Sequence, residues 1–435
     1  MRVLISVLGY YKTYREVTYE VANDRNEVVS GQTRFSSAAL KKAFSPDRTI
    51  VIVPFSLYHE SVGEAVKELP GGKYSELARA VVNRFNSEAG PFVIGELFVA
   101  PNTGRFTGRD GGAFEYVEAG VKGRRLSLFQ NYAFFKLYEA LKGVKDDRVE
   151  ILVDLTHGVN YMQFLVSDVV RALAYSLLKD VKLRFFNSDP VGPGRDDPGV
   201  VVRINEVVRE NISPKEGFSG AVMGLMTLDD RDLREALGNN NDYRDKVRRL
   251  ANASFAGVLQ VVGAFRDEIN RLLDLALNPI RGIDGCEVKV SGNDNLTRLE
   301  YGCSVPPLAY KVVAALDAMY KATEGWEEEF SSSWLMGKVK KYGNPVMEDL
   351  VENELDIISR RVELDGSWRY LSEAPRKQEK REREGRARRA NKRNLIAHGG
   401  LEENVTCAKR EGDEVYFKYC AEEGFDVYGH ILRQF

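Results

Sequence analysis

The sequence predicts two structural classes in one chain, an N-terminal α/β domain followed by a mainly helical part. In the first 210 residues, short runs that are apolar at every position alternate with segments whose apolar residues recur at helical spacing. Runs that are apolar throughout suit parallel strands buried on both faces, and their alternation with helices favours a doubly wound sheet. From residue 242 onward the periodicity is mostly helical.

The elements of the α/β part can be placed in order from these patterns. Pro54 stops the second expected strand because proline has no amide hydrogen to donate. Segment 211–238 is mixed in polarity and contains glycine, so we expect a connection there. The expected strands are 3–8, 49–53, 92–99, 149–153, 181–186 and 200–204, and the expected helices are 36–44, 75–86, 128–141 and 159–178.

The second half is expected to contain helices and two β-hairpins. Asn278–Pro279 is expected to end the first helix, and a Gly-Asn-Asp turn predicts the first hairpin. The resulting domains are 1–210, a helical linker with a hairpin insertion at 211–305, and a helical domain at 306–435. The expected helices are 242–277, 308–322, 346–362 and an Arg-rich stretch ending at His398, and the hairpins are 285–303 and 405–419.

Composition excludes several functional classes. Of 435 residues, 43% are hydrophobic and 29% are charged, which is typical of a globular protein. The net charge of −2 excludes a globally basic nucleic-acid-binding protein, although a local basic patch remains open. No run approaches the length of a membrane span and the N-terminus lacks the pattern of a signal peptide, so we expect a cytoplasmic protein with no membrane partner.

The four cysteines lie in pairs around the two expected hairpins. Cys286 and Cys303 flank the first hairpin, and Cys407 and Cys420 flank the second. No pair has the C-x-x-C spacing of zinc ribbons or thioredoxin-type sites. Cysteines at the ends of paired strands lie within bridging range, so two disulfides are a hypothesis that the sequence leaves open.

The segment ANKRNLIAHGG at 390–400 carries the sharpest chemical signal. Asn394 and His398 are four residues apart and would share one helix face, whereas Arg393 and His398 would point about 140° apart. Gly399–Gly400 would stop the helix with a left-handed cap. A histidine that moves protons near neutral pH, with an arginine to neutralise phosphate charge, suits phosphodiester chemistry, although a histidine at a helix end can also be a simple capping cation.

A basic run precedes this motif. Residues 376–393 contain ten Lys or Arg and three Glu, a net charge of +7. The run could be a solvated helix with internal salt bridges, but its position directly before Arg393 favours an approach surface for a polyanion.

A second cluster of polar residues follows the strand 149–153. The sequence DLTHGVNYM at 154–162 lies at a strand-to-helix junction, where doubly wound sheets bind ligands and where a helix N-terminus offers amide groups to phosphate. The loop GYYKTYRE at 9–16 ends the first strand with aromatic and basic side chains. Small polar residues in SGQTRFSSAAL at 30–40 open a helix, and Ser36 and Ser37 could simply be its caps.

Two of these motifs together resemble a known family. DLTHGVNYM after a buried strand is similar to the signature loop of CARF domains, which are Rossmann-like sensors of CRISPR systems. RNLIAH is similar to the R-x-x-x-x-H motif of HEPN ribonucleases. The order of a CARF domain, a helical linker and a HEPN domain resembles the ancillary ribonucleases of type III CRISPR systems over nearly the whole chain.

This resemblance implies an allosterically activated enzyme. Two protomers would pair as a homodimer or a higher homo-oligomer, and their CARF domains would bind a cyclic oligoadenylate, in this subfamily the tetramer. Binding would activate the HEPN dimer to cleave single-stranded RNA in antiviral defence without a metal or other cofactor. The ribose 2′-OH would attack the adjacent phosphate and leave a cyclic phosphate and a 5′-hydroxyl.

The resemblance also implies site residues. His398 would be the general acid and base, Arg393 would stabilise the transition-state phosphate and Asn394 would orient its neighbours; no metal site is expected. Whether His157 contacts the ligand or only orders the loop stays open. The ligand-binding residues would be Asp154, Thr156, His157, Gly158 and Asn160, with weaker matches at Gly9, Tyr10, Lys12, Gln32 and Thr33.

Two other classes of protein remain alternatives on the residues alone. A nucleotide-sensing transcription regulator would bind duplex DNA through 376–393, with a steep salt dependence and no turnover. A metal-dependent nuclease would need clustered carboxylates near a lysine at a strand end, and the sequence offers no such cluster. The Arg-Asn…His segment followed by Gly-Gly favours the ribonuclease, because a helix that binds DNA does not require it.

Overall fold

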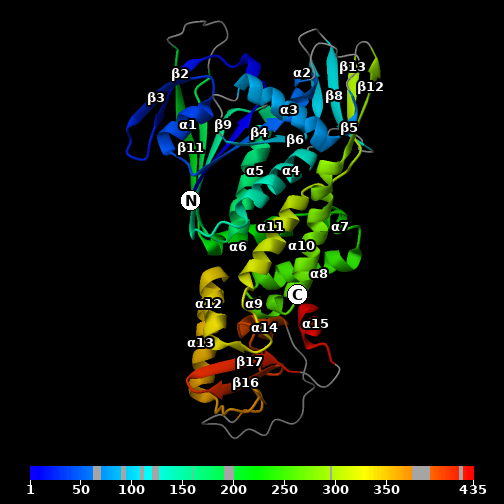
Figure 1. Ribbon diagram of the computed structural model, residues 1–435. Helices are drawn as coiled ribbons and strands as arrows, with labels where there is room; N and C mark the ends of the chain where they lie inside the picture. Colours follow the sequence, from blue (N-terminus) through cyan, green and yellow to red (C-terminus); the bar gives the residue numbers. More distant parts are fainter. Residues whose placement is uncertain are drawn as a thin grey trace. The chain divides into compact units, whose positions relative to one another are not determined.

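The computed structural model divides into two compact units (Figure 1). Unit 1 comprises Met1–Ser213 and Ala276–Tyr310, and unit 2 comprises Pro214–Leu275 and Lys311–Phe435. This division differs from the three expected segments, because the first hairpin belongs to unit 1, whereas Pro214–Leu275, most of the helical segment before it, belongs to unit 2. The structure describes residues 1–61, 70–89, 95–107, 112–119, 127–158, 160–190, 200–293, 296–374, 392–420 and 425–435.

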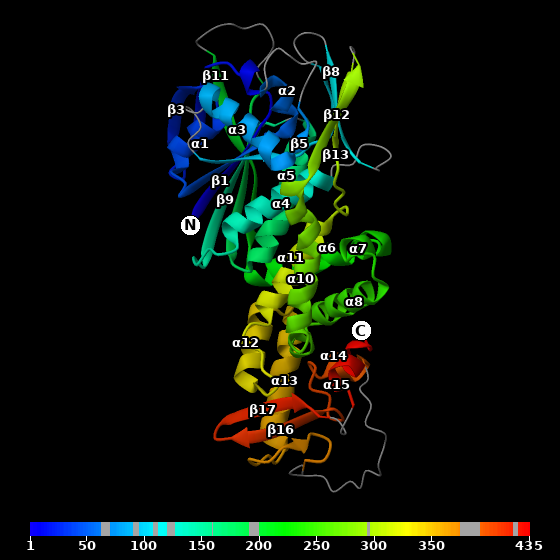
Figure 2. The same ribbon diagram turned by 45° about the vertical axis from the view of Figure 1, so that its right-hand side comes forward.

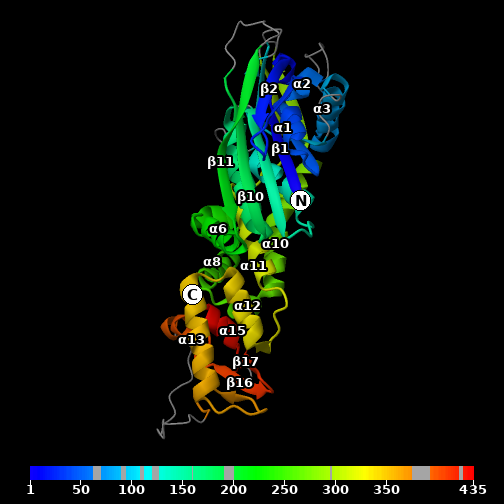
Figure 3. The same cartoon turned by 90° about the vertical axis from the view of Figure 1, so that its left-hand side faces the viewer.

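Unit 1 is built on an eight-stranded sheet of order β3-β2-β11-β10-β9-β1-β4-β6. The five strands from β10 to β6 are parallel, whereas β11 runs antiparallel to β10. Figure 3 shows β10 and β11 side by side. The strands are β1 (Arg2–Leu8), β2 (Val17–Ala22), β3 (Val28–Thr33), β4 (Arg48–Pro54), β6 (Glu96–Ala100), β9 (Arg148–His157), β10 (Asp180–Ser188) and β11 (Val201–Ile212).

The predicted α/β class is confirmed, with a mixed sheet in place of an all-parallel one. The central strands are apolar and buried at nearly every position, as parallel strands covered on both faces should be. β2 and β3 were not predicted, because their alternating polarity falls in segments that resemble loops. Of the expected strand 92–99, residues 92–94 lie outside the described part, and the rest overlaps β6.

The helices of unit 1 follow the predicted periodicity closely. Leu40 and Phe44 pack with Leu4, Leu152 and Phe186 in one core cluster, which fixes α1 against the sheet. The larger helices are α1 (Ser36–Phe44), α3 (Tyr74–Ala89), α4 (Ser127–Leu141) and α5 (Asn160–Leu177), and the short ones are α2 (Tyr58–Ser61) and the 3-10 turns η1 (Tyr11–Thr13), η2 (Phe55–Leu57) and η4 (Gly282–Gly285).

The first predicted hairpin is confirmed, but it is part of a second sheet in unit 1. Its strands β12 (Glu287–Asn293) and β13 (Leu296–Tyr301) pair antiparallel, and β13 also pairs in parallel with β8 (Ala113–Glu118) (Figure 2). β5 (Gly72–Lys73) and β7 (Gly104–Thr107) complete this sheet. A hairpin read from local sequence alone gives no sign of the strand, some 180 residues upstream, that it joins.

Unit 2 contains more helices than the sequence predicted. Segment 211–238 is not a simple connection, since it holds α6 and α7, and the expected helix 242–277 is three helices. Gly257, at φ +75°, ends the first of these, and Pro279 lies inside the last turn of α10 rather than ending the helix before it. The helices are α6 (Pro214–Met226), α7 (Asp230–Ala236), α8 (Asn241–Phe255), α9 (Leu259–Gly263), α10 (Arg266–Arg281), α11 (Ala309–Ala322), α12 (Ser332–Tyr342), α13 (Pro345–Arg361), α14 (Lys392–Ala397) and α15 (Val427–Leu432).

The second predicted hairpin is also confirmed, within a small sheet that the helical class did not anticipate. Its strands are β16 (Thr406–Glu411) and β17 (Glu414–Tyr419), flanked by β15 (Arg369–Tyr370) and β14 (Phe330–Ser331). Ala408 and Phe417 on its inner face pack with Leu335 of α12 and with Val351 and Ile358 of α13. The helices 308–322 and 346–362 are confirmed within one residue at each end.

The structure pairs all four cysteines as the sequence hypothesis suggested. Cys286 is bonded to Cys303 and Cys407 to Cys420, with Cα–Cα separations of 5.5 and 5.8 Å. Each bridge joins the ends of one hairpin, so each limits the freedom of the unfolded chain over a loop of 17 or 13 residues.

A thiol titration tests both bridges. Protein denatured without reductant should show no reactive thiol, and four after reduction. Because each loop closure stabilises the native state by about 3 kcal/mol in the chain-entropy model, reduction should also lower the melting temperature. Four reactive thiols without reductant would contradict the pairing.

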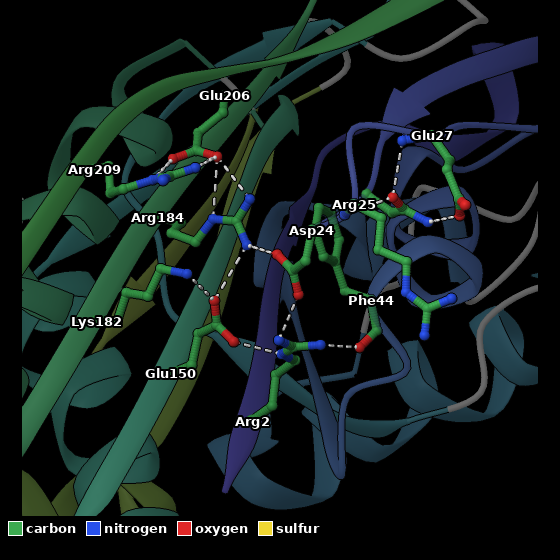
Figure 4. A network of polar contacts seen from close by, with 11 residues as sticks. Arg2, Asp24, Arg25, Glu27, Phe44, Glu150, Lys182, Arg184, Glu206 and Arg209 are labelled. Atoms are coloured by element: carbon green, nitrogen blue, oxygen red, sulfur yellow. Dashed lines mark hydrogen bonds and ion pairs between the residues drawn. The ribbon is translucent and has the colours of Figure 1, made fainter.

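A network of charged side chains joins four neighbouring strands of the large sheet (Figure 4). Arg184 of β10, with a side chain only 3% exposed, contacts Asp24, Glu150 and Glu206. Arg2 of β1 contacts Asp24 and Glu150 as well. Burial alone would raise the pKa of Glu150 and Glu206, but hydrogen bonds from the surrounding cations outweigh it and hold each pKa below its ordinary value.

This network makes stability depend on pH. Since the carboxyl pKa values are lower in the folded than in the unfolded state, the stabilisation is present above about pH 4.5 and is lost as the pH falls further. Glu150→Gln should therefore lower the melting temperature at pH 7 and flatten its decline between about pH 5 and pH 3. Melting curves that shift equally at every pH would contradict this role for Glu150.

Candidate functional site

The C-terminal motif lies on the short helix α14 and the turn that follows it. Leu395 is fully buried and anchors the helix, whereas Arg393 and Asn394 are exposed. The His398 amide donates to the Asn394 carbonyl at 2.9 Å, so these two residues are one helical turn apart, as predicted. Arg393 precedes Asn394 by one position and lies on a different side of the helix. Of the basic run 376–393, only Lys392 and Arg393 are among the described residues.

The predicted helix stop at Gly399–Gly400 is confirmed. Gly399 has φ +57° and Gly400 has φ +85°, a region that residues with a Cβ rarely adopt. Both glycines are buried. The backbone therefore turns sharply directly after His398 and leaves the side chain of His398, 43% exposed, at the end of the helix.

A carboxylate that the sequence did not reveal contacts His398. Glu354 of α13 places its Oε2 atom 3.0 Å from His398 Nδ1, and its side chain is only 15% exposed. When Nδ1 carries the proton it donates to Glu354, and Nε2 is left to accept or give a proton. No local signal marks Glu354, because Glu348 and Glu352 on the same helix look equivalent in sequence and only the tertiary packing distinguishes them.

Asp154 in unit 1 is buried, and its carboxylate accepts hydrogen bonds from three surrounding residues. β9 continues through His157, so Asp154 lies within the strand rather than after it. The fully buried carboxylate accepts hydrogen bonds from Ser6 Oγ at 2.9 Å, Ser36 Oγ at 2.7 Å and the Thr156 amide at 3.1 Å. Ser36 is therefore not a helix cap, and it joins α1 to the end of β9.

His157 is held between two tyrosines, Tyr14 from the aromatic loop 9–16 and Tyr19 of β2, which the sequence analysis did not single out. Its ring stacks on Tyr14 with centroids 4.1 Å apart, and Nε2 lies 3.0 Å from the Tyr19 hydroxyl. Its carbonyl accepts hydrogen bonds from the Tyr14 hydroxyl and from the Gly9 amide. Burial lowers the pKa of His157, which favours the neutral ring, and the contacts with Tyr14 and Tyr19 fix its orientation.

The other predicted ligand residues lie around this centre at different depths. Gly9 and His157 meet at the ends of neighbouring strands, and a Cβ on Gly158 would come 2.7 Å from Gln163. Lys12 is 3.7 Å from Glu88 of α3. Gln32 is exposed on β3, which pairs with β2 and so lies farther along the sheet. Thr33 is buried, Tyr10 and Thr156 are half-buried, and Asn160 begins α5 with a side chain outside the described set.

Comparisons with known proteins agree with this architecture. Residues 3–190 match the family model "CRISPR system endoribonuclease Csx1, CARF domain", and residues 344–423 match the model "CRISPR system endoribonuclease Csx1, HEPN domain". The first range includes the Asp154 loop, and the second includes Glu354, Arg393 and His398. The chain therefore belongs to the CARF–HEPN family of CRISPR-associated ribonucleases, as the two sequence motifs predicted.

Individual relatives are distant. The CRISPR system endoribonuclease Csx1 of Methanocaldococcus jannaschii is 23% identical over 93% of this chain and 86% of its own length. Among solved structures, Enterococcus italicus Csm6 bound to cyclic hexa-2′-fluoro-hexa-dAMP matches 82% of this chain and 84% of its own, at 10% identity and a TM-score of 0.21.

Within the described residues, no helix is both long and apolar enough to cross a membrane.

Proposed function

We propose that the protein is a metal-independent endoribonuclease that cleaves single-stranded RNA and is activated by a cyclic oligoadenylate, with the tetramer as the activator. The observation that carries the proposal is the exposed His398 ring at the end of α14, paired with the Glu354 carboxylate 3.0 Å away. Membership of the CARF–HEPN family supports both the reaction and the class of activator.

The proposed reaction uses the RNA itself as nucleophile. A histidine removes the proton of a ribose 2′-OH, and that oxygen attacks the adjacent phosphorus. The bond from phosphorus to the 5′-oxygen breaks, and this oxygen takes a proton as it leaves. The products are a 2′,3′-cyclic phosphate and a 5′-hydroxyl. Imidazole moves the protons and the guanidinium of Arg393 neutralises the phosphorane, so the step requires no metal.

We propose that the active site is composite. On an ideal helix Arg393 and His398 would point about 140° apart, so we do not expect one copy of the motif to direct both side chains at one phosphate. A two-fold axis would bring two copies of the motif together, with Arg393 and His398 contributed twice. One His398 could then accept the 2′ proton while the other protonates the leaving oxygen, and Asn394 would orient them.

We assign the CARF loops to activator binding. Gly9, Tyr10 and Lys12 follow β1, Thr156 lies at the end of β9, and Gly158 and Asn160 follow β9, at the strand ends where such folds bind nucleotides. Asp154 and His157 would hold these loops rather than contact the ligand, because the Asp154 carboxylate and the His157 Nε2 atom have partners within the chain. Gln32 and Thr33 remain candidates for more peripheral contacts.

Removing the His398 ring tests the proposed function. His398→Ala should abolish cleavage of labelled single-stranded RNA in EDTA while cyclic tetra-adenylate binding, followed by calorimetry, stays within about twofold, since the general acid–base contribution alone is worth about 10²- to 10⁴-fold. Retained cleavage in this variant would remove the site assignment. Wild-type cleavage that requires a divalent cation would contradict the mechanism.

Glu354 should matter to turnover rather than to substrate binding. Glu354→Gln keeps the size of the side chain but removes the charge that orients and stabilises the imidazolium, so we expect kcat to fall about ten- to a hundredfold with KM little changed. Glu352→Gln is the matched control, since Glu352 is exposed on the same helix. Equal kcat values for the two variants would show that the Glu354 contact is incidental.

A further inference from the structure

Two buried side chains hold the backbone that follows His398. Gln260 of α9 donates from Nε2 to the Gly399 carbonyl at 2.8 Å. Tyr419, the last residue of β17, donates from its hydroxyl to the Gly400 carbonyl at 2.7 Å. Burial raises the pKa of Tyr419 well above its ordinary value, so this hydroxyl keeps its proton and remains a donor.

Gln260 is a polar residue on a buried helix whose other side chains are mostly apolar. Gln260 is 0% exposed, and so are its helical neighbours Leu259, Val261 and Val262. A buried amide costs free energy unless its hydrogen bonds are made, and an aliphatic side chain of similar size would pack in such a shell without that cost. Among the described residues only the Nε2 side of the amide has a hydrogen-bond partner, the Gly399 carbonyl, and Oε1 is buried without one. The one bond that this buried amide makes therefore defines the geometry of Gly399.

The space around Gly399 and Gly400 is also sterically restricted. A Cβ on Gly400 would overlap the Gln260 amide, and a Cβ on Gly399 would overlap Val351. Val351 lies on α13, one turn before Glu354 on the same helix. α9, β17 and α13 thus converge on Gly399–Gly400, and α13 also supplies the carboxylate that contacts the His398 ring.

We propose that Gln260 and Tyr419 are positioning residues for catalysis, which fix the turn after His398 so that its ring is held at one angle to Glu354 and to the RNA. This inference rests on the proposed function, because it assumes that His398 moves the protons. The two residues lie 139 and 19 positions from the carbonyls that they bind, so the turn is defined by tertiary structure and not by α14 alone.

Two conservative substitutions test this role. Gln260→Met keeps the length of the side chain but removes the amide, and Tyr419→Phe removes only the hydroxyl. In protein saturated with cyclic tetra-adenylate, each should lower kcat for labelled single-stranded RNA by about ten- to a hundredfold and leave KM within about twofold, because small displacements of a catalytic group cost that much. Circular dichroism should report an unchanged fold.

A destabilised control separates positioning from loss of structure. Ser331→Ala removes the side-chain cap of α12 in the same unit, where Ser331 Oγ accepts from the Trp334 amide, so it should lower the melting temperature without lowering kcat. The inference is overturned if Gln260→Met and Tyr419→Phe keep wild-type kcat, if they change KM instead, or if Ser331→Ala loses as much kcat at an equal loss of melting temperature. Activity retained in His398→Ala would instead overturn the proposed function.

Discussion

The arrangement of the proposed catalytic motif depends on one contact, the hydrogen bond between His398 and Glu354 at 3.0 Å. α14 has only six residues, too few to be stable in isolation, and His398 follows its last helical position. Its place must therefore come from outside the helix. The carboxylate on α13 holds the ring from one side, while Gln260 and Tyr419 hold the two glycines that follow. An exposed imidazole is thus carried on a backbone that is itself buried.

The loops proposed to bind the activator are also held by buried polar side chains. Asp154 is fully buried, and its carboxylate joins Ser6 on β1 to Ser36 on α1. The His157 ring is stacked on the Tyr14 ring and hydrogen-bonded to the Tyr19 hydroxyl. In both places a side chain is fixed by partners distant in sequence. Loops that are already ordered before binding lose less conformational entropy when a ligand binds, so less of the binding free energy is lost in ordering them.

The sequence predicted what short-range patterns encode. The helix Ser36–Phe44 was placed to the residue by its apolar spacing, and the Gly-Gly stop after His398 followed from glycine's access to positive φ. Long-range partners were not predicted, since no pattern separates Glu354 from Glu352 or links Gln260 to Gly399. β2 and β3 were missed because strands with one exposed face resemble loops, and Pro279 misled because α10 continues past it to Arg281.

The central claim is that paired His398 and Arg393 groups cleave RNA through its own 2′-hydroxyl, and the ends of the products test it most directly. Mass spectrometry of a defined single-stranded RNA, cut in EDTA with cyclic tetra-adenylate, should find 2′,3′-cyclic phosphate and 5′-hydroxyl ends, and one 2′-deoxy nucleotide at the cleaved position should block that cut. Products with 3′-hydroxyl and 5′-phosphate ends, or normal cleavage at the deoxy position, would contradict the account.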